Sequence, residues 1–235
     1  MRILAIIIAA TVGVTLPQAS DAQDLDRAVS AYNNGDYKTA LRELRLLSEQ
    51  GLAEAQVTLG VMYDNGQGVP QNYAEAVRWS RLAAEQGHAK AQYNLGLMYS
   101  RGEGVSQNYA EATRLYRLAA EQGLASAQTN LGSMYYKGQG VSQNYAEAAR
   151  LYRLAAEQGD AKAQNNLGAM YYIGHGVPQN HQLAYMWLSL AAAKGFEGAA
   201  SVRDRAAGNM TPEKIGRAQQ LSAECFNRNY QGCAK

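Results

Sequence analysis

The chain repeats one 36-residue pattern four times, and this period constrains the fold more than any other feature. The clearest copy occupies residues 88–123 and reads HAKAQYNLGLMYSRGEGVSQNYAEATRLYRLAAEQG. The glycines that close successive copies are Gly51, Gly87, Gly123, Gly159 and Gly195, so full units run over 52–87, 88–123, 124–159 and 160–195. A fixed period of this length is typical of a solenoid, because each unit can bury its apolar face only against its neighbours.

The first half of each unit has the pattern of a helix. In the unit 52–87, Ala55 and Leu59 recur with other apolar residues at helical spacing and predict a helix over 53–65. Gly66 follows, and a glycine at this place commonly ends a helix in the left-handed conformation. Each unit is therefore expected to open with a helix that a glycine turn closes.

The second half of each unit begins with a helix-capping signature. Asn72 precedes a predicted helix over 73–86, and Glu75 stands three residues further on. In such a capping box, each side chain can accept a hydrogen bond from a free backbone N–H of the other residue. The equivalent pairs are Asn108 with Glu111, Asn144 with Glu147, and Asn180 with Leu183, so the acid is missing from the fourth unit.

A glycine also stands inside the first helix of every unit, where it costs about 1 kcal/mol of helix propensity relative to alanine. These residues are Gly60, Gly96, Gly132 and Gly168. Because the glycine recurs in every unit despite this cost, we predict that another helix approaches it closely. The expected contacts on that helix are Ala83 and Ala84 and their equivalents. The larger residues Leu59, Met62, Tyr73 and Leu82 and their equivalents are expected to fill the remaining space, with tyrosine hydroxyl groups at the rim.

The complete pattern resembles a known repeat. It reads A-x-A-Q-x-x-L-G-x-M-Y-x-x-G-x-G-V-x-Q-N-Y-x-E-A-x-R-x-x-x-x-A-A-x-Q-G and is similar to the Sel1-like repeat, a relative of the tetratricopeptide repeat, over residues 52–195. The resemblance implies an all-α fold, an α/α right-handed superhelical solenoid whose first helices line the concave surface. It also implies a scaffold or adaptor that binds other proteins. Some cysteine-rich relatives are linked to β-lactam binding, but they carry a disulfide in each repeat, which this chain lacks, so that activity is not expected here.

The two ends of the repeat array depart from the pattern. Residues 24–51 form a shorter unit whose turn resembles that of a tetratricopeptide repeat, with Asp36 as the expected N-cap. After the last repeat we predict a helix over 196–207 and another over 212–226, with Pro212 at its first position. Because terminal units of solenoids are usually atypical, we expect 24–51 and 196–235 to cap the stack. A partner-binding tail is the alternative for the C-terminal segment.

The N-terminus has the features of a secretory signal peptide over 1–22. Arg2 supplies the positive charge, and an apolar stretch over 3–16 is too short to span a bilayer comfortably. Ser20 and Ala22 place small residues at positions −3 and −1 of a cleavage site, so we expect cleavage after Ala22. An uncleaved anchor is the alternative. We expect the mature protein to be exported, with the periplasm as its compartment and secretion as the alternative.

The chain has two cysteines, Cys225 and Cys233, at its C-terminal end. An even number of cysteines in an exported chain predicts a disulfide, because the compartment is oxidising. Two free thiols are the alternative. Since the spacing is not Cys-x-x-Cys, a redox-active pair is disfavoured.

No catalytic motif stands out in the sequence. The three histidines, His88, His175 and His181, lack a zinc-binding spacing, and we expect His175 and His181 to be a surface pair without a metal. There is no Gly-x-Ser-x-Gly or Ser-x-x-Lys motif, and the Gly-x-Gly pairs follow helices rather than strands. We therefore expect no enzyme, no cofactor and no metal. With a formal net charge of +2 and no basic block, nucleic acid is not an expected partner.

Some columns of the repeat vary between copies while the packing columns stay constant. The varying positions fall on one face of the first helix. We predict that this face binds a protein or peptide partner, with Tyr93, Leu97, Arg101, Asn130, Tyr136, Lys137, Tyr172 and Ile173 as contacts. Exposed aromatic residues such as Tyr136 and Tyr172 are typical interface anchors. A solvated face free to drift is the alternative. We expect a monomeric scaffold; a secreted host-interaction protein, or a hydrolase or binder of cell-wall fragments, are the alternative functions.

Overall fold

The computed structural model describes residues 19–233, which form α-helices and no strands. The helices are α1 (Ala19–Asn33), α2 (Tyr37–Glu49), α3 (Ala53–Asn65), α4 (Tyr73–Glu85), α5 (Ala89–Arg101), α6 (Tyr109–Glu121), α7 (Ala125–Lys137), α8 (Tyr145–Ala156), α9 (Ala161–Ile173), α10 (His181–Ala193), α11 (Ala199–Ala207) and α12 (Pro212–Asn227). The predicted signal peptide lies outside the described residues as far as residue 18. Within 19–233, no helix is long and apolar enough to cross a membrane.

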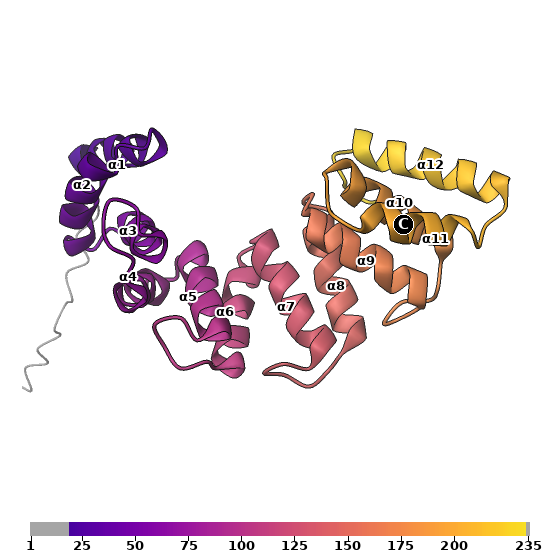
Figure 1. Ribbon diagram of the computed structural model, residues 1–235, viewed down its shortest axis with the longest axis horizontal. Helices are drawn as coiled ribbons and strands as arrows, with labels where there is room; N and C mark the ends of the chain where they lie inside the picture. Colours follow the sequence, from indigo (N-terminus) through magenta and orange to yellow (C-terminus); the bar gives the residue numbers. More distant parts are fainter. Residues whose placement is uncertain (1–18, 234–235) are drawn as a thin grey trace, which may run out of the picture.

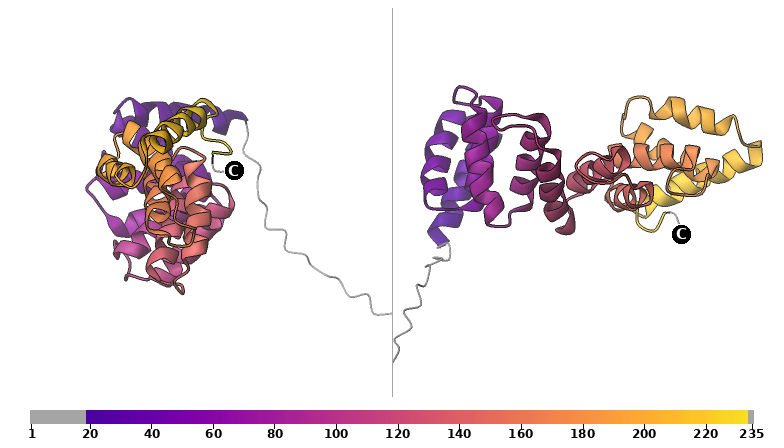
Figure 2. Two further views of the ribbon diagram at one scale, coloured as in Figure 1. Left: turned by 90° about the vertical axis from the view of Figure 1, so that its right-hand side faces the viewer. Right: turned by 90° about the horizontal axis from the view of Figure 1, so that it is seen from below.

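Successive helices pair and stack into a curved rod. Figure 1 shows an arc whose two ends, α1–α2 and α10–α12, rise on the same side. The helix axes turn along the stack, so the N-terminal and C-terminal helices run in different directions when the arc is seen from below (Figure 2). Odd-numbered helices of the repeats are the first helices of their units, and even-numbered ones are the second. The predicted all-α solenoid is confirmed.

The helix boundaries follow from local capping. Gly66 ends α3 with a φ of +67°, as its place in the sequence predicts. The Asn72 side chain accepts hydrogen bonds from the backbone N–H groups of Ala74 and Glu75, at 3.1 and 3.2 Å. Equivalent bonds begin α6, α8 and α10. These asparagines satisfy donors that a helix N-terminus otherwise leaves free.

The reciprocal half of the predicted capping box is wrong. The N–H of Asn72 donates to the carbonyl oxygen of Tyr63 at 2.9 Å, because the short loop returns the chain to the end of α3, where that carbonyl is free. Glu75 instead forms an ion pair with Arg78, 3.1 Å away in the next turn of α4. The same pairing recurs in the second and third units, whereas the fourth has lost both members of the ion pair, as Leu183 and Met186.

The glycines inside the first helices do meet a close neighbour, but not the predicted alanine pairs. An added Cβ at Gly96 would lie 2.8 Å from a ring carbon of Tyr116, and one at Gly132 would lie 2.8 Å from the same atom of Tyr152. At the equivalent contacts, Gly60 faces Ser80 and Gly168 faces Leu188. The glycine therefore makes room for one variable side chain from the second helix of its own unit.

Two polar ladders run along the stack: a glutamine pair inside each of the first three units, and an arginine–tyrosine bond from one unit to the next. Gln86 donates to Gln56, Gln122 to Gln92 and Gln158 to Gln128, each at 2.8 Å. Arginines of α2, α4, α6 and α8 donate to the tyrosine hydroxyl near the end of the following helix, at 2.5–3.3 Å. The turn glycine Gly104, with a φ of +69°, lies against the backbone carbonyl of Tyr73 in the preceding unit, where no side chain would fit.

Two predicted core positions are only partly covered. Leu59 and Met62 are fully buried, but Tyr73 and Leu82 of α4 are 36% and 37% exposed. Leu190, the equivalent of Leu82 in the fourth unit, is 4% exposed. The C-terminal helices pack against α10, and Leu190 lies in a core cluster against which Val202 and Leu221 of those helices also pack.

The C-terminal segment closes the stack. Its first helix, α11, begins at Ala199 rather than at residue 196, because Gly198 has a φ of +80°. The side chain of Thr211 accepts from the N–H of Lys214 at 3.4 Å and begins α12. A disulfide joins Cys225 to Cys233, and both cysteines are buried.

The disulfide loop packs against the junction between α8 and α9. The side chain of Gln231 donates to the carbonyl oxygen of Glu157 at 2.8 Å. The ammonium group of Lys194 lies 4.3 Å from the ring centre of Tyr230 and donates to the carbonyl of Gly159. The loop therefore links the tail to residues more than seventy positions earlier in the chain.

Candidate functional site

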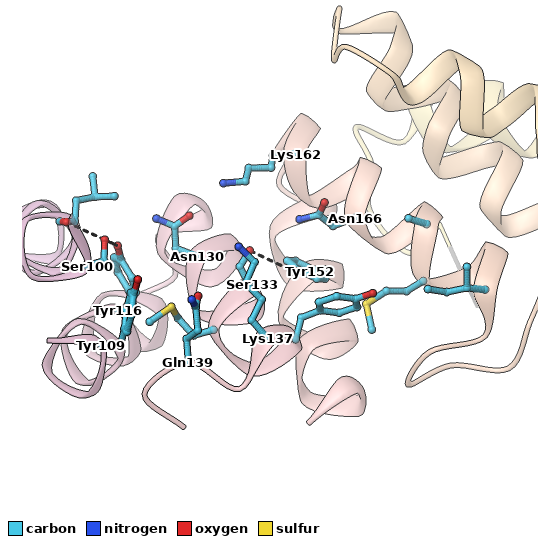
Figure 3. A pocket seen from close by; sticks show the side chains of 16 residues that line it. Ser100, Tyr109, Tyr116, Asn130, Ser133, Lys137, Gln139, Tyr152, Lys162 and Asn166 are labelled. Carbon is cyan, nitrogen blue, oxygen red and sulfur yellow. Dashed lines mark hydrogen bonds between the residues drawn. The ribbon is translucent and has the colours of Figure 1, made fainter. Parts of the chain in front are cut away.

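A pocket with a volume of about 490 Å³ lies on the inner surface of the arc, over the second, third and fourth repeats. Figure 3 shows labelled side chains that converge on it from successive helix pairs. Its lining residues are Leu97, Ser100, Tyr109, Tyr116, Asn130, Ser133, Met134, Tyr136, Lys137, Gln139, Tyr152, Lys162, Asn166, Ala169, Met170 and Ile173. Most belong to the first helices α5, α7 and α9.

Five of the eight residues predicted as partner contacts line this one pocket. They are Leu97, Asn130, Tyr136, Lys137 and Ile173. Arg101 lies beside them in a smaller pocket of about 200 Å³, which shares Leu97 with the larger one. The varying face thus forms a continuous hollow surface rather than scattered positions.

The other two predicted residues lie apart from the pocket lining. Tyr93 is half-buried and packs on Tyr116, with 5.9 Å between the ring centres. Tyr172 is also half-buried, because His181 and Arg205 of the following helices lie over its ring at 5.5 and 5.9 Å. Packing of α10 and α11 residues over Tyr172 therefore removes it from the set of exposed aromatic anchors.

Tyr136 lines the pocket but is likewise half-buried. Its ring meets Tyr145 edge-on at 5.1 Å, and His175 stacks on Tyr145 at 4.6 Å. His181 packs on Tyr172 instead, so the expected surface pair of histidines is wrong: each imidazole packs on a different tyrosine. Within residues 19–233, no group of three or more histidine, cysteine or acidic side chains could hold a metal ion.

Two tyrosines of the second helices supply hydroxyl groups to the pocket. Tyr116 and Tyr152 reach it over the glycines of α5 and α7. The hydroxyl of Tyr116 donates to Ser100 at 3.3 Å, and those of Tyr152 and Ser133 lie 3.0 Å apart (Figure 3). Burial is the main cause that raises the pKa of both tyrosines, so they stay neutral donors at physiological pH.

These two tyrosines, together with Lys162 and Asn166, were absent from the sequence-based prediction of the site. The tyrosine and lysine columns do vary, whereas Asn166 shares the column of the predicted contact Asn130. The positions of Tyr116 and Tyr152 hold serine in the first unit and leucine in the fourth. Lys162 is equivalent to Glu54, Lys90 and Ser126. Variation in these columns was the available signal, but the prediction considered one face of the first helix alone.

The architecture and the hollow inner face define a class: a tandem helix-pair solenoid with an extended inner surface. The Sel1 repeat family model matches residues 53–88, 89–124, 125–160 and 161–196, which is more than half of the chain. The chain therefore belongs to the Sel1 repeat family. Proteins of this family are generally scaffolds for protein–protein interaction rather than catalysts.

Solved structures show the same fold. A Sel1 repeat protein from Oxalobacter formigenes is 34% identical, with a TM-score of 0.75, and the match covers 87% of this chain and 83% of that chain. A protective antigen of uropathogenic Escherichia coli strains with an SLR fold is 36% identical, with a TM-score of 0.74. That match covers 90% of this chain but 47% of the antigen.

A more distant structure agrees in fold alone. The immunity protein Pa5087 from Pseudomonas aeruginosa is 18% identical, with a TM-score of 0.54, over 94% of this chain and 86% of that chain. A comparison with curated protein sequences finds no significant match.

Proposed function

We propose that this protein is a non-catalytic scaffold that binds a peptide segment of a partner protein in the pocket formed by α5, α7 and α9. One observation carries the proposal: the varying positions Leu97, Tyr136, Lys137 and Ile173 meet, together with Asn130, in a single pocket that spans three repeats. The apolar part of this lining can bury side chains, and the amide and hydroxyl groups can bond to a peptide backbone. Residues 24–51 and 196–235 then serve as caps that hold the scaffold at a fixed length.

The pocket amides provide the test. Asn130 and Asn166 are half-buried, and their replacement by alanine removes two polar groups from the lining without touching the helix caps. Gln219→Ala with Gln220→Ala, on the exposed side of α12, is a matched control that removes two amides elsewhere. A peptide selected on the purified protein from a random display library should bind at least tenfold more weakly to the pocket variant and equally well to the control. Equal binding to all three proteins would show that the pocket is not the binding site.

The compartment is part of the same proposal. The sequence of residues 1–22 and the buried disulfide support export to an oxidising compartment, for which we propose the periplasm. Similarity to a protective antigen favours a second candidate, a secreted host-interaction protein. Fractionation of cells that express the chain separates the two, and N-terminal sequencing of the exported form should begin at Gln23.

A further inference from the structure

The pocket carries two lysines that form no ion pair in the part of the chain that the structure describes. Lys137 lies in the last turn of α7 and Lys162 in the first turn of α9; both are exposed and both line the pocket. Neither forms an ion pair within residues 19–233. In contrast, Lys90, the equivalent of Lys162 in the second unit, lies 3.9 Å from Glu54.

The other lining residues of the pocket are also suited to bind a negatively charged group. Among the lining residues there is no aspartate or glutamate. Asn130, Asn166 and the neutral hydroxyl of Tyr152 can donate hydrogen bonds to a carboxylate, and hydrogen bonds to ionised groups are stronger than those between neutral groups. Ile173 is 44% exposed and offers an apolar contact at the edge. A carboxylate beside an apolar side chain fits this surface.

The adjoining small pocket has an excess of negative charge instead. Asp64 and Glu103 line this pocket, and Arg101 is the single cation among its lining residues. Arg101 lies 3.4 Å from Glu103, so the carboxylate of Asp64 has no cation of its own among these residues. Burial first, and repulsion from Glu103 second, raise the pKa of Asp64, which shows that its charged form would gain from a nearby cation. Because the two pockets share Leu97, one extended chain can lie across both.

We propose that the inner surface selects a peptide whose acidic residues lie over the third and fourth repeats, and whose basic residue, where present, lies over the first and second. This inference rests on the proposed function and adds the chemistry of the partner segment. The charges at the two ends of the surface fix the direction in which the segment lies, because the reversed peptide would place like charges together.

The test uses fluorescein-labelled peptide pools of stated composition. One pool combines Leu, Tyr and Ser with Asp and Glu, and the other combines the same neutral residues with Lys and Arg. Anisotropy of each pool is measured with the purified protein, with a Lys137→Glu/Lys162→Glu variant, and with a Lys38→Glu/Lys214→Glu control. The control makes the same change in net charge at exposed lysines outside the pocket. Thermal unfolding confirms that each variant remains folded.

The expected result is at least tenfold tighter binding of the acidic pool by the unchanged protein and the control, with this preference lost or inverted in the pocket variant. Added salt should weaken binding of the acidic pool to the unchanged protein, because exposed charges are screened. Equal binding of both pools, or tighter binding of the basic pool, would overturn the charge preference but leave the peptide-binding function standing. Binding of neither pool would count against both proposals.

Discussion

The glycines inside helices allow the same substitution, glycine to alanine, to be tested at two sites where its expected effects on the free energy of unfolding are opposite. Gly132 in α7 and Gly216 in α12 both occupy helix interiors. A Cβ at Gly216 would meet no atom within 4 Å, whereas one at Gly132 would lie 2.8, 2.9 and 3.3 Å from ring atoms of Tyr152, which is 3% exposed. The first site changes helix propensity alone, and the second adds a clash that a buried ring cannot easily relieve.

The sizes of the helix-propensity gain and the overpacking cost decide whether each substitution stabilises or destabilises the protein. Alanine gains about 1 kcal/mol over glycine in a helix, so Gly216→Ala should raise the free energy of unfolding by up to about that amount. Overpacking in a well-packed core costs about 1–3 kcal/mol, so Gly132→Ala should lower it by about 0–2 kcal/mol in total. The two variants should therefore differ by about 1–3 kcal/mol in urea unfolding, with Gly132→Ala the less stable.

A double-mutant cycle identifies the cause. Tyr152→Ser reproduces the first unit, where the glycine faces the small side chain of Ser80. In that background, Gly132→Ala should lose most of its cost, and the pocket should lose the hydroxyl near Ser133. If Gly132→Ala stabilises the protein as much as Gly216→Ala does, the explanation of the helix glycines by close packing is refuted.

Three further measurements test other parts of the structure. Replacing Cys225 and Cys233 by alanine should lower the free energy of unfolding by about 2.5 kcal/mol, from the loop-closure entropy of so short a loop, and unchanged denaturant midpoints would contradict this. Asn144→Ala should cost about 1 kcal/mol through loss of the α8 cap, and the same assay measures it. Hydrogen bonding to Arg150 is the main cause that lowers the pKa of Glu147 below 4.5. Stability from this pair is present above pH 4.5 and is lost as pH falls through the folded-state pKa, so Arg150→Met should weaken the protein at pH 7 and have little effect at the lowest pH.

The sequence was sufficient for the fold because each unit carries its own local signals at a fixed spacing. Asn72 and Gly66 mark helix ends by their own backbone chemistry, so both boundaries were predicted correctly. The partner of Gly96 was not, because the choice between Ala119 and Tyr116 depends on the angle at which two helices cross. A one-dimensional pattern contains no such angle. The burial of Leu190 depends in the same way on how the C-terminal helices pack against α10.

The site was predicted in part for the same reason. Leu97 and Ile173 lie on the varying face of their own helices, so helical periodicity alone found them. Tyr152 enters the pocket from the second helix, across a glycine of the first, and only the packed pair of helices shows that route. Tyr172 was placed in the site because its column varies between units; His181 of α10 and Arg205 of α11, at positions where the repeat pattern is lost or has ended, lie over its ring.

The glutamine ladder ends at the fourth unit, and this has an evolutionary consequence. Lys194 stands where Gln86, Gln122 and Gln158 stand in the earlier units, and the side-chain oxygen of Gln164 is buried without a partner in the described chain. Because the bond lies inside one unit, a duplicated second or third unit would bring its own Gln–Gln bond into the array, whereas a duplicated fourth unit would add a second unit that lacks it. Gene duplication can therefore lengthen this protein in the middle of its array, while its last unit stays fixed as the terminus.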